Sequence, residues 1–491
     1  MGKIYAPDFL WDGMTETIEK ERAFLVEENT ITFVGTLEEC LKKDPKAETE
    51  RGRFLIVPGF VDAHDHGRGI SPIGFSVPDM CLEMWLQNLY KIPAISHRLL
   101  AYYDGLRLAS AGVTTVLHSH NPNRFEGMRE EIIDAAKGYS DAGIRSILCP
   151  LYLDQNKGIY AEREKFICSL PKDVSEYFRS GIQDKKMTID EYLELIDSLR
   201  EDLREEIASG MVEIQLHPNG GHWCSDEALL RMKRYAIDNH MKIHMHLLET
   251  RYQKEYAFKS WGCSFISHYE AIGMLGPWLT CAHMVHLEDE DIDLLAQHRV
   301  MCINNPSSNI RLRSGMFRLT DLVDADVPVG LGLDGCAYDD DQDYLREIRT
   351  AFYNMSGTGV DGCISPYTTL KMATSKGSMI ADGRLSEGVI REGAKADFVM
   401  ISLEQLTRPY ADESVDMADL LIHRGCRACV EKVFVGGTMI INRQEYQKKL
   451  AIAEAELVEA ISESRKINQP VDLEWKKTIT QKIHDFYKEW E

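Results

Sequence analysis

The feature that most constrains the fold of this 491-residue chain is a repeat of short apolar segments that alternate with amphipathic stretches. Most of the stretches between them, such as residues 226–240, place their apolar residues at helical spacing. Repeated strand–helix units are typical of parallel sheets, and eight of them predict an α/β fold with a (β/α)8, or TIM-like, barrel. The predicted strands are 59–66, 112–120, 144–153, 211–218, 242–249, 279–287, 300–306 and 327–335.

The two ends of the chain predict a second structural unit. Residues 1–58 contain short strand-like segments broken by turns, and residues 387–445 return to strand patterning. We expect both segments to pair in one small β-sandwich-like domain beside a catalytic barrel of residues 59–386. Residues 446–491 predict a charged helical tail, which could cover the barrel or contact another subunit. A helical insertion is expected at 154–210.

The charge balance argues against two classes of partner. The chain has 56 Lys and Arg against 78 Asp and Glu, a formal net charge of -22. Such a surface repels nucleic acid and anionic lipid, so neither is expected as a partner. The amino terminus shows no secretory signal, and no apolar run reaches the roughly 20 residues of a membrane helix. We therefore expect a cytoplasmic protein, and we interpret its scattered cysteines as buried thiols.

Ligand-type side chains cluster at the ends of the predicted strands, where the active sites of parallel barrels lie. The first strand ends with His64 and His66, which a period of two places on one face. An HxH pair alone is a weak signal, but three other strand ends carry such residues. They are His244 and His246, His283 and His286, and Asp334. Together these residues predict a metal site at one end of the barrel.

The order of the motifs resembles that of the amidohydrolase superfamily. The motifs are VPGFVDAHDH, HLLET, AHMVHL, NPSSNIRLRSG, GLGLDG, MATSKGSMI and GVIREGAKADFVMI. Within the superfamily, the chain is similar to the branch that contains triazine hydrolases, guanine deaminase and the adenosine and S-adenosylhomocysteine deaminases. The resemblance spans about residues 4–445. It implies a metal-dependent hydrolase that acts on carbon–nitrogen bonds other than peptide bonds, assembled as a homo-oligomer.

The resemblance also implies a ligand set. The metal ligands of the family correspond here to His64, His66, His246 and Asp334. The HxxE pattern selects His246 rather than His244, which is left a core or supporting role. Binuclear relatives use a carboxylated lysine at the end of strand four, and VEIQLHPNGG has no lysine there. We therefore expect one divalent metal ion, for which Zn2+ suits three nitrogens and one carboxylate, although Fe2+ would accept the same set.

Hydrolytic deamination is the reaction that the resemblance implies. A metal lowers the pKa of bound water toward neutrality. Asp334 would accept the proton of that water and pass it to the leaving group. Glu249 would protonate a ring nitrogen of the substrate, and His283 would stabilise the tetrahedral intermediate. The expected substrate is a small amino-substituted nitrogen heterocycle of the purine, pterin, pyrimidine or triazine type, which would release ammonia.

Substrate contacts are expected from Glu83 and Trp85 in LEMWLQ, from His217 and from Arg68. Trp85 could stack on a planar ring, or it could be a packing residue of the loop. The acidic run 339–343 could favour a cationic substrate, or it could be a solvated turn. Additional pocket candidates are His118, His120 and His222.

Two other functions remain open from the sequence. The same site could cleave a cyclic amide or displace another leaving group, as imidazolone and chlorotriazine hydrolases do. A scaffold that has lost its chemistry would retain the barrel but lack some ligands. All of the expected ligands are present, which favours an enzyme.

Overall fold

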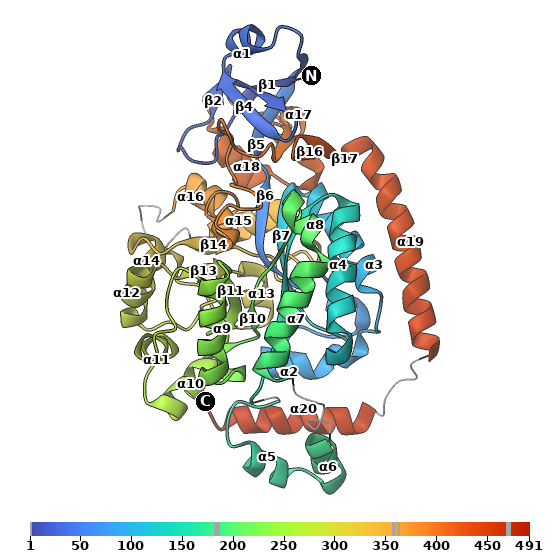
Figure 1. Ribbon diagram of the computed structural model, residues 1–491, viewed down its shortest axis with the longest axis vertical. Coiled ribbons are helices and arrows are strands. Elements are labelled where there is room, and N and C mark those ends of the chain that lie inside the picture. Colours follow the sequence, from blue (N-terminus) through green and yellow to red (C-terminus); the bar gives the residue numbers. More distant parts are fainter. Residues whose placement is uncertain (1, 157, 181–186, 356–359, 361–363, 468–472) are drawn as a thin grey trace.

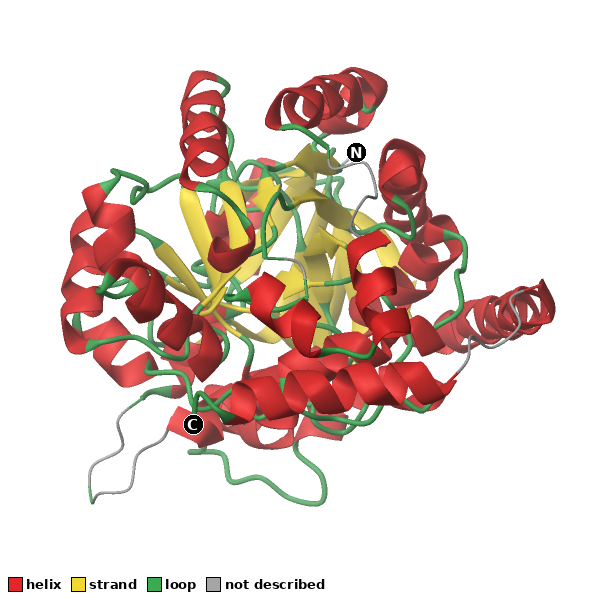
Figure 2. Ribbon diagram, turned by 90° about the horizontal axis from the view of Figure 1, so that it is seen from below, coloured by secondary structure: helices red, strands yellow, loops and turns green. Residues whose placement is uncertain are grey.

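The structure is a computed structural model that describes residues 2–156, 158–180, 187–355, 360, 364–467 and 473–491. Two parallel sheets occupy its centre, and helices surround them (Figures 1 and 2). A third, mixed sheet lies at one end of the molecule, where the amino terminus is found (Figure 1). The chain therefore has the α/β architecture that the alternating pattern predicts.

The central strands form two parallel groups. The first has the order β10-β8-β7-β6, with β9 also paired to β8, and the second has the order β11-β12-β13-β14. Their bounds are β6 (Phe60–Asp65), β7 (Val113–His120), β8 (Arg145–Tyr152), β9 (Val212–Ile214), β10 (His217–Pro218), β11 (Ile243–Leu247), β12 (Leu279–His283), β13 (Met301–Asn304) and β14 (Val329–Leu331).

Backbone contacts join the two parallel sheets at both seams. On one side, isolated parallel bridges pair Leu216 with Ile243 and Gly220 with His246. On the other side, the backbone N–H of Asp334 donates to the carbonyl oxygen of His64 at 2.9 Å. The carboxyl ends of the two sheets consequently face the same end of the molecule.

Several strands are shorter than the sequence predicts. The expected strand 211–218 is divided into β9 and β10, and the expected strand 327–335 ends at Leu331. Leu248, His283 and Asp334, at or just beyond the ends of β11, β12 and β14, have positive φ angles of 53°, 75° and 57°. An extended strand cannot continue through this left-handed region, so the chain turns there. Two of these three residues, His283 and Asp334, are candidate catalytic residues.

Helices pack around the parallel strands (Figure 2). The predicted helix 226–240 is α9 (Asp226–Asp238), which begins after Ser225 because that hydroxyl accepts a hydrogen bond from the backbone N–H of Ala228. Several helices follow β6, β7 and β8, the first three parallel strands. They include α3 (His97–Ser110), α4 (Met128–Ala142), α5 (Arg163–Ser169), α6 (Lys172–Ser180), α7 (Ile189–Asp202) and α8 (Arg204–Ser209). Those that follow later strands are α10 (Arg251–Trp261), α11 (Phe265–Ala271), α12 (Asp289–His298), α13 (Pro306–Arg311), α14 (Leu319–Asp324), α15 (Tyr344–Met355) and α16 (Pro366–Met372).

The expected insertion at 154–210 is helical in the described residues, and its helices divide into two groups. Helix α7 contacts α4 and α9, so it packs as one of the helices around the strands. Helices α5 and α6 lie away from the sheets (Figure 1). Residues 157 and 181–186 of the insertion lie outside the described part of the chain.

Both ends of the chain contribute to the third sheet, as expected. β15 pairs antiparallel with β5, with Val399 opposite Val57. Aromatic rings of Tyr5, Phe24 and Phe398 pack together in its core. The strands are β1 (Lys3–Leu10), β2 (Glu19–Lys20), β3 (Ala23–Glu27), β4 (Thr30–Gly35), β5 (Glu48–Pro58), β15 (Phe398–Ser402), β16 (Val430–Val435) and β17 (Thr438–Asn442).

A buried ion pair connects this sheet to the central strands. Arg145, the first residue of β8, donates through Nε and Nη2 to the two carboxylate oxygens of Asp397 at 2.8 and 3.0 Å. The side chains are only 4% and 1% exposed. The second oxygen of Asp397 also accepts from the backbone N–H of Gly436 at 2.6 Å. The pair therefore joins β8 to the turn between β16 and β17.

The carboxy-terminal segment forms two helices, α19 (Arg443–Ile467) and α20 (Leu473–Lys488). Helix α19 runs along α3, and α20 contacts α2 (Leu82–Trp85) (Figure 1). Tyr487 of α20 is buried, and its hydroxyl accepts a hydrogen bond from the backbone N–H of Tyr160 at 3.2 Å. The expected helical tail is thus present, and it covers part of the molecule. Within the described residues, no helix has both the length and the apolar character needed to cross a bilayer.

Candidate metal centre and active-site cavity

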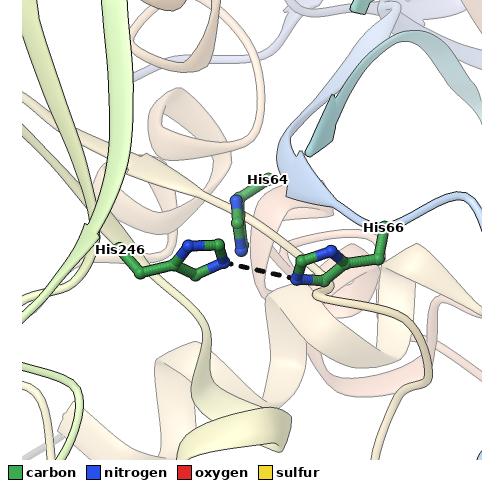
Figure 3. Close-up of side chains that lie close together, drawn as sticks. All are labelled: His64, His66 and His246. Carbon is green, nitrogen blue, oxygen red and sulfur yellow. Dashed lines mark hydrogen bonds between the residues drawn. The ribbon is translucent and has the colours of Figure 1, made fainter. Parts of the chain in front are cut away.

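Four side chains from distant parts of the sequence meet at the carboxyl ends of the parallel strands. His64 lies on β6, His66 follows it, His246 lies on β11 and Asp334 follows β14. Asp334 Oδ1 lies 3.3 Å from His64 Nε2 and 3.1 Å from His66 Nε2. Nε2 of His66 and Nε2 of His246 are 3.3 Å apart, and Figure 3 shows the three rings pointing toward one another. The structure therefore brings together the four predicted ligands.

The other nitrogen of each ring fixes its orientation. His66 Nδ1 donates to the carbonyl oxygen of Ser119 at 2.9 Å, and His246 Nδ1 donates to that of Asn219 at 2.6 Å. A neutral imidazole has one N–H, and a carbonyl oxygen only accepts, so the Nε2 atoms of both rings present lone pairs. This is the arrangement that metal-binding histidines adopt.

The geometry and chemistry of these donors fit a divalent cation. Metal–ligand bonds of about 2.0–2.1 Å place the ligands of a tetrahedral site about 3.3 Å apart, and the measured separations are 3.1 to 3.3 Å. His64 Nε2 is buried and makes no hydrogen bond among the described residues. A buried, unpaired acceptor is costly unless a ligand satisfies it. Burial raises the pKa of Asp334, but the contacts with His64 and His66 outweigh this effect and hold the pKa well below its usual range.

Two further predicted catalytic residues lie beside these donors. His283 Nε2 is 3.8 Å from Glu249 Oε2 and 3.9 Å from Asp334 Oδ2. His283 Nδ1 lies 3.0 Å from Asn309 Oδ1, so it donates to that oxygen and its Nε2 faces the other groups as an acceptor. Ser308 donates to Asp334 Oδ2 at 2.6 Å. Burial, together with the charges of Asp334 and Glu83, raises the pKa of Glu249 well above its usual range.

A cavity opens onto this cluster. Its empty volume is about 850 Å³, a figure that includes its opening to solvent. Its polar wall contains His66, His246, Glu249, His283 and Asp334. Leu82, Leu86 and Leu89 form an apolar wall.

Arg68 and Trp85 line the same cavity, as predicted for substrate contacts. The guanidinium carbon of Arg68 lies 5.3 Å from the centre of the Trp85 ring, a cation–π arrangement. Arg68 also donates through Nη2 to Asn121 Oδ1 at 3.4 Å. Burial lowers the pKa of Arg68, and the carboxylates of Asp334 and Asp65 oppose that shift.

The structure does not bring Glu83 to the cavity surface. Its Oε1 accepts hydrogen bonds from the hydroxyls of Tyr160 and Thr250 at 2.7 and 2.6 Å, and its Oε2 accepts from the thiol of Cys81 at 2.7 Å. Glu83, Tyr160 and Thr250 are all buried. Glu83 thus holds the surrounding loops together rather than facing the lining residues.

His217 does not line the cavity either. Its Nε2 lies 2.7 Å from the hydroxyl of Ser119, and its Nδ1 lies 2.7 Å from the carbonyl oxygen of His244. Both ring nitrogens are therefore occupied by neighbouring strands. The other candidates, His118, His120 and His222, are also buried outside the lining.

The carboxylates of the 339–343 run pair with arginines. Arg311 donates through Nη2 to Asp340 at 2.9 Å, and it also binds Asp79. Arg346 forms ion pairs with Asp339 and Asp341 at 2.6 and 3.4 Å. No residue of the run lines the cavity described here, and these contacts favour its interpretation as a loop-ordering turn.

Some supporting residues have no signal in the sequence. Asn219 and Ser119 act through main-chain carbonyl oxygens, which any residue could supply. Ser308 lies in the motif NPSSNIRLRSG, which is recognisable, but its contact with Asp334 depends on the start of α13. Asn309 of the same motif bonds His283. These contacts become visible only when the strands are assembled.

Comparison with known proteins identifies the family. Residues 55–440 match the model of the amidohydrolase family, which covers most of the chain. The chain therefore belongs to the amidohydrolase family.

Similar proteins extend over nearly the whole chain. It is 27% identical over 460 residues to the 5-methylthioadenosine/S-adenosylhomocysteine deaminase of Thermodesulfovibrio yellowstonii, covering 91% of this chain and 95% of that protein. It is 26% identical over 442 residues to the 5'-deoxyadenosine deaminase of Methanopyrus kandleri, covering 88% and 92%. The crystal structure of an adenosine deaminase from Xanthomonas campestris with bound zinc superposes with a TM-score of 0.73 at 21% identity, covering 94% and 98%. This last comparison establishes a shared fold.

Proposed function

We propose that this protein is a metal-dependent aminohydrolase that deaminates an amino-substituted nitrogen heterocycle. The observation that carries the proposal is the placement of Glu249, His283 and Asp334 on one cavity with His66 and His246. The imidazole of His283 thus lies within 4 Å of both the proton donor Glu249 and the carboxylate of Asp334, beside a set of metal donors.

His64, His66, His246 and Asp334 would hold one divalent cation. Three imidazoles and one carboxylate suit Zn2+, and Fe2+ would accept the same donors. Bound there, the cation would supply Lewis-acid chemistry and lower the pKa of water toward neutrality. The zinc in the Xanthomonas structure supports this assignment through the shared fold.

The chain's own residues account for the proton transfers. Burial raises the pKa of Glu249 well above its usual range, which favours the protonated carboxyl that could donate to a ring nitrogen of the substrate. That proton makes the adjacent carbon more electrophilic. Asp334 Oδ2 would accept one proton of the attacking water and pass it to the amino group, which leaves as ammonia, and Ser308 orients that carboxylate. The hydroxyl proton of the intermediate would return to Glu249 as the carbonyl forms. His283, whose Nδ1 donates to Asn309, would accept a hydrogen bond at Nε2 from the hydroxyl that adds to the ring and so orient it.

A 6-aminopurine nucleoside altered at its 5' position is the substrate class that we propose. The named activities of the two deaminase relatives support this choice. The apolar wall of Leu82, Leu86 and Leu89 and the ring of Trp85 offer a surface for a planar base. Arg68 would approach the ribose or its substituent.

We also propose that the two parallel sheets form one closed (β/α)8 barrel of residues 59–386, joined at the Leu216–Ile243 bridge and at the Asp334–His64 hydrogen bond. The strands contributed by residues 1–58 and 387–445 support a separate small β domain. A cytoplasmic homo-oligomer stays a prediction from the sequence and the resemblance.

A panel of heterocyclic amines tests the proposal. The Zn2+-loaded protein is incubated with adenosine, its 5'-substituted analogues, guanine, pterins and aminotriazines, and released ammonia is measured. We expect ammonia from the 5'-substituted adenosines and little from the Glu249→Gln variant. A different outcome would contradict deamination: no ammonia is released, and the protein instead opens the ring of a cyclic amide or removes chloride from a chlorotriazine. The site would then act on another leaving group.

A further inference from the structure

A second group of metal-binding side chains lies at the carboxyl end of β7, outside the cavity. His97 is the first residue of α3, His120 is the last residue of β7 and Glu131 lies in the first turn of α4. The Nε2 atoms of His97 and His120 lie 3.2 and 3.1 Å from the same oxygen, Oε2 of Glu131. None of the three side chains lines the cavity, so the mechanism proposed above does not use them.

The hydrogen-bond chain behind His120 fixes its tautomer. Tyr139 donates its only proton to Asp104 at 2.9 Å, so its oxygen accepts from Nδ1 of His118 at 3.1 Å. A neutral His118 then has a lone pair on Nε2, which lies 3.4 Å from Nδ1 of His120 and accepts from it. His120 is fully buried, and its single N–H is used in this contact. Its Nε2 therefore turns a lone pair toward Glu131.

His97 presents an acceptor to the same carboxylate. The amide Nδ2 of Asn123 lies 3.0 Å from His97 Nε2, and an amide nitrogen only donates hydrogen bonds. The backbone N–H of Asn123 also donates to Glu131 Oε2 at 3.0 Å, so Asn123 occupies both acceptors. The lone pair of His120 Nε2 faces the same carboxylate oxygen, and no donor of the described residues lies between them. Acceptors at this distance repel one another unless a positive species lies between them. One proton can bridge only one imidazole to the carboxylate, whereas a divalent cation can accept all three donors.

The spacing agrees with a tetrahedral site. The separations of 3.1 and 3.2 Å match the 3.1 to 3.3 Å found between the donors of the first site. Two histidines and one glutamate are also a ligand set that Zn2+ uses when water completes its coordination. The side chains of His97 and Glu131 are 12% and 15% exposed, so water can reach this position.

We propose that His97, His120 and Glu131 form a second divalent-cation site, suited to Zn2+, that is separate from the active-site metal. The cation would join the start of α3, the end of β7 and the start of α4. The loop between His120 and α4 carries Asn121, which bonds Arg68 on the cavity wall. The second site would therefore hold a loop that contacts the substrate-binding region. Because Asn123 donates to His97 Nε2, its side chain would have to move before His97 can bind the cation.

Metal stoichiometry of the full chain tests this proposal. Wild-type protein is loaded with excess Zn2+, desalted and analysed for zinc per chain, alongside Glu131→Gln and His97→Gln. We expect each variant to retain one equivalent fewer than the wild type. His268→Gln is the matched control, because His268 pairs with Asp226 at 3.0 Å and belongs to none of the candidate metal clusters among the residues that the structure describes. This control is expected to retain the wild-type content.

The difference in zinc content does not depend on the proposed reaction or on occupancy of the first site. Equal zinc content in the wild type and both variants would overturn the second site. If no substrate of the panel releases ammonia, the proposed deamination fails, but the second site is not affected. If Glu131→Gln does not fold, His97→Gln decides the test, since His97 is partly exposed. The visible absorption of the Co2+-loaded protein gives an independent measurement: His97→Gln should lose part of the wild-type signal, and an unchanged spectrum would count against the site.

Discussion

His64 Nδ1 lies 2.8 Å from His244 Nε2, and this contact sets the direction in which His64 can bind a metal. His244 Nδ1 donates to the hydroxyl oxygen of Thr280 at 2.9 Å, and Thr280 in turn donates to the carbonyl oxygen of Ile243. His244 Nε2 is therefore an acceptor, and His64 must direct its N–H toward it. The lone pair of His64 is left on Nε2, which faces His66, His246 and Asp334.

Replacing His244 should weaken metal binding without removing a ligand. His244→Phe leaves Nδ1 of His64 without its acceptor, so the ring loses its fixed tautomer. Loss of such a supporting contact typically costs about 10–100-fold in metal affinity. Competition with a chromophoric chelator measures the change. His286→Gln serves as the control, because His286 bonds Ser314 outside the donor set, and an unchanged affinity in His244→Phe would contradict the argument.

Glu249→Gln should lower kcat and leave the metal content unchanged. The amide is similar in size but cannot deliver the proton that the neutral carboxyl of Glu249 supplies, and general acid catalysis contributes roughly 10²- to 10⁴-fold. Steady-state kinetics on the best substrate of the panel, together with zinc analysis, measures both effects. Glu255→Gln on α10 lies outside the cavity lining and should retain wild-type kcat. If Glu249→Gln retained the wild-type kcat, Glu249 would not be the proton donor of the reaction.

Glu347 should make stability fall as pH rises. Burial raises its pKa to about 8, although hydrogen bonds from Ser307 oppose the shift. The folded protein therefore holds a proton that the unfolded chain loses above its ordinary pKa of 4.5. The stabilisation is complete below that value and is lost as pH rises to about 8, at roughly 1 kcal/mol per pH unit.

Denaturant unfolding of the wild type and Glu347→Gln at pH 5, 6.5 and 8 measures this term. The glutamine can still accept from the backbone N–H of Ser307, and it carries no titratable proton. The stability of the variant relative to the wild type should therefore increase with pH. A constant difference between the two proteins across this range would show that Glu347 titrates normally.

The buried pair of Arg145 and Asp397 should be important for stability. Asp397→Asn leaves the guanidinium of Arg145 buried without its bidentate partner, which typically costs about 3–5 kcal/mol. The exposed pair of Arg98 and Asp141 is the matched control, because its side chains are 54% and 44% exposed. Asp141→Asn should change the free energy of unfolding by less than about 1 kcal/mol. Similar losses in both variants would contradict a special role for the buried pair.

The convergence of the four candidate metal ligands could be predicted from the sequence, because strand periodicity and the family resemblance both place them at strand ends. His64 and His66 lie two residues apart at a strand end, so they reach the same side of the sheet. His246 and Asp334 also follow the resemblance at strand ends. Strand lengths were less predictable, because the positive φ angles at His283 and Asp334 depend on packing at the end of the sheet.

Glu83 illustrates what the sequence could not provide. Its motif favoured a substrate contact, whereas in the structure its carboxylate binds Tyr160 and Thr250. Tyr160 comes from the insertion and contacts Tyr487 of the carboxy-terminal helix. Such a contact among three distant segments has no local pattern. The cluster of His97, His120 and Glu131 was not visible for the same reason.

The pairing of β5 with β15 has a consequence for synthesis of the protein. Val57 and Val399 are neighbours in the sheet although roughly 340 residues separate them in the chain. During translation, β5 leaves the ribosome long before its partner exists, and the edge that β15 will cover stays open to other strands. A nascent chain that ends before β15 should consequently need chaperones to avoid aggregation, and release of the complete polypeptide should relieve that need.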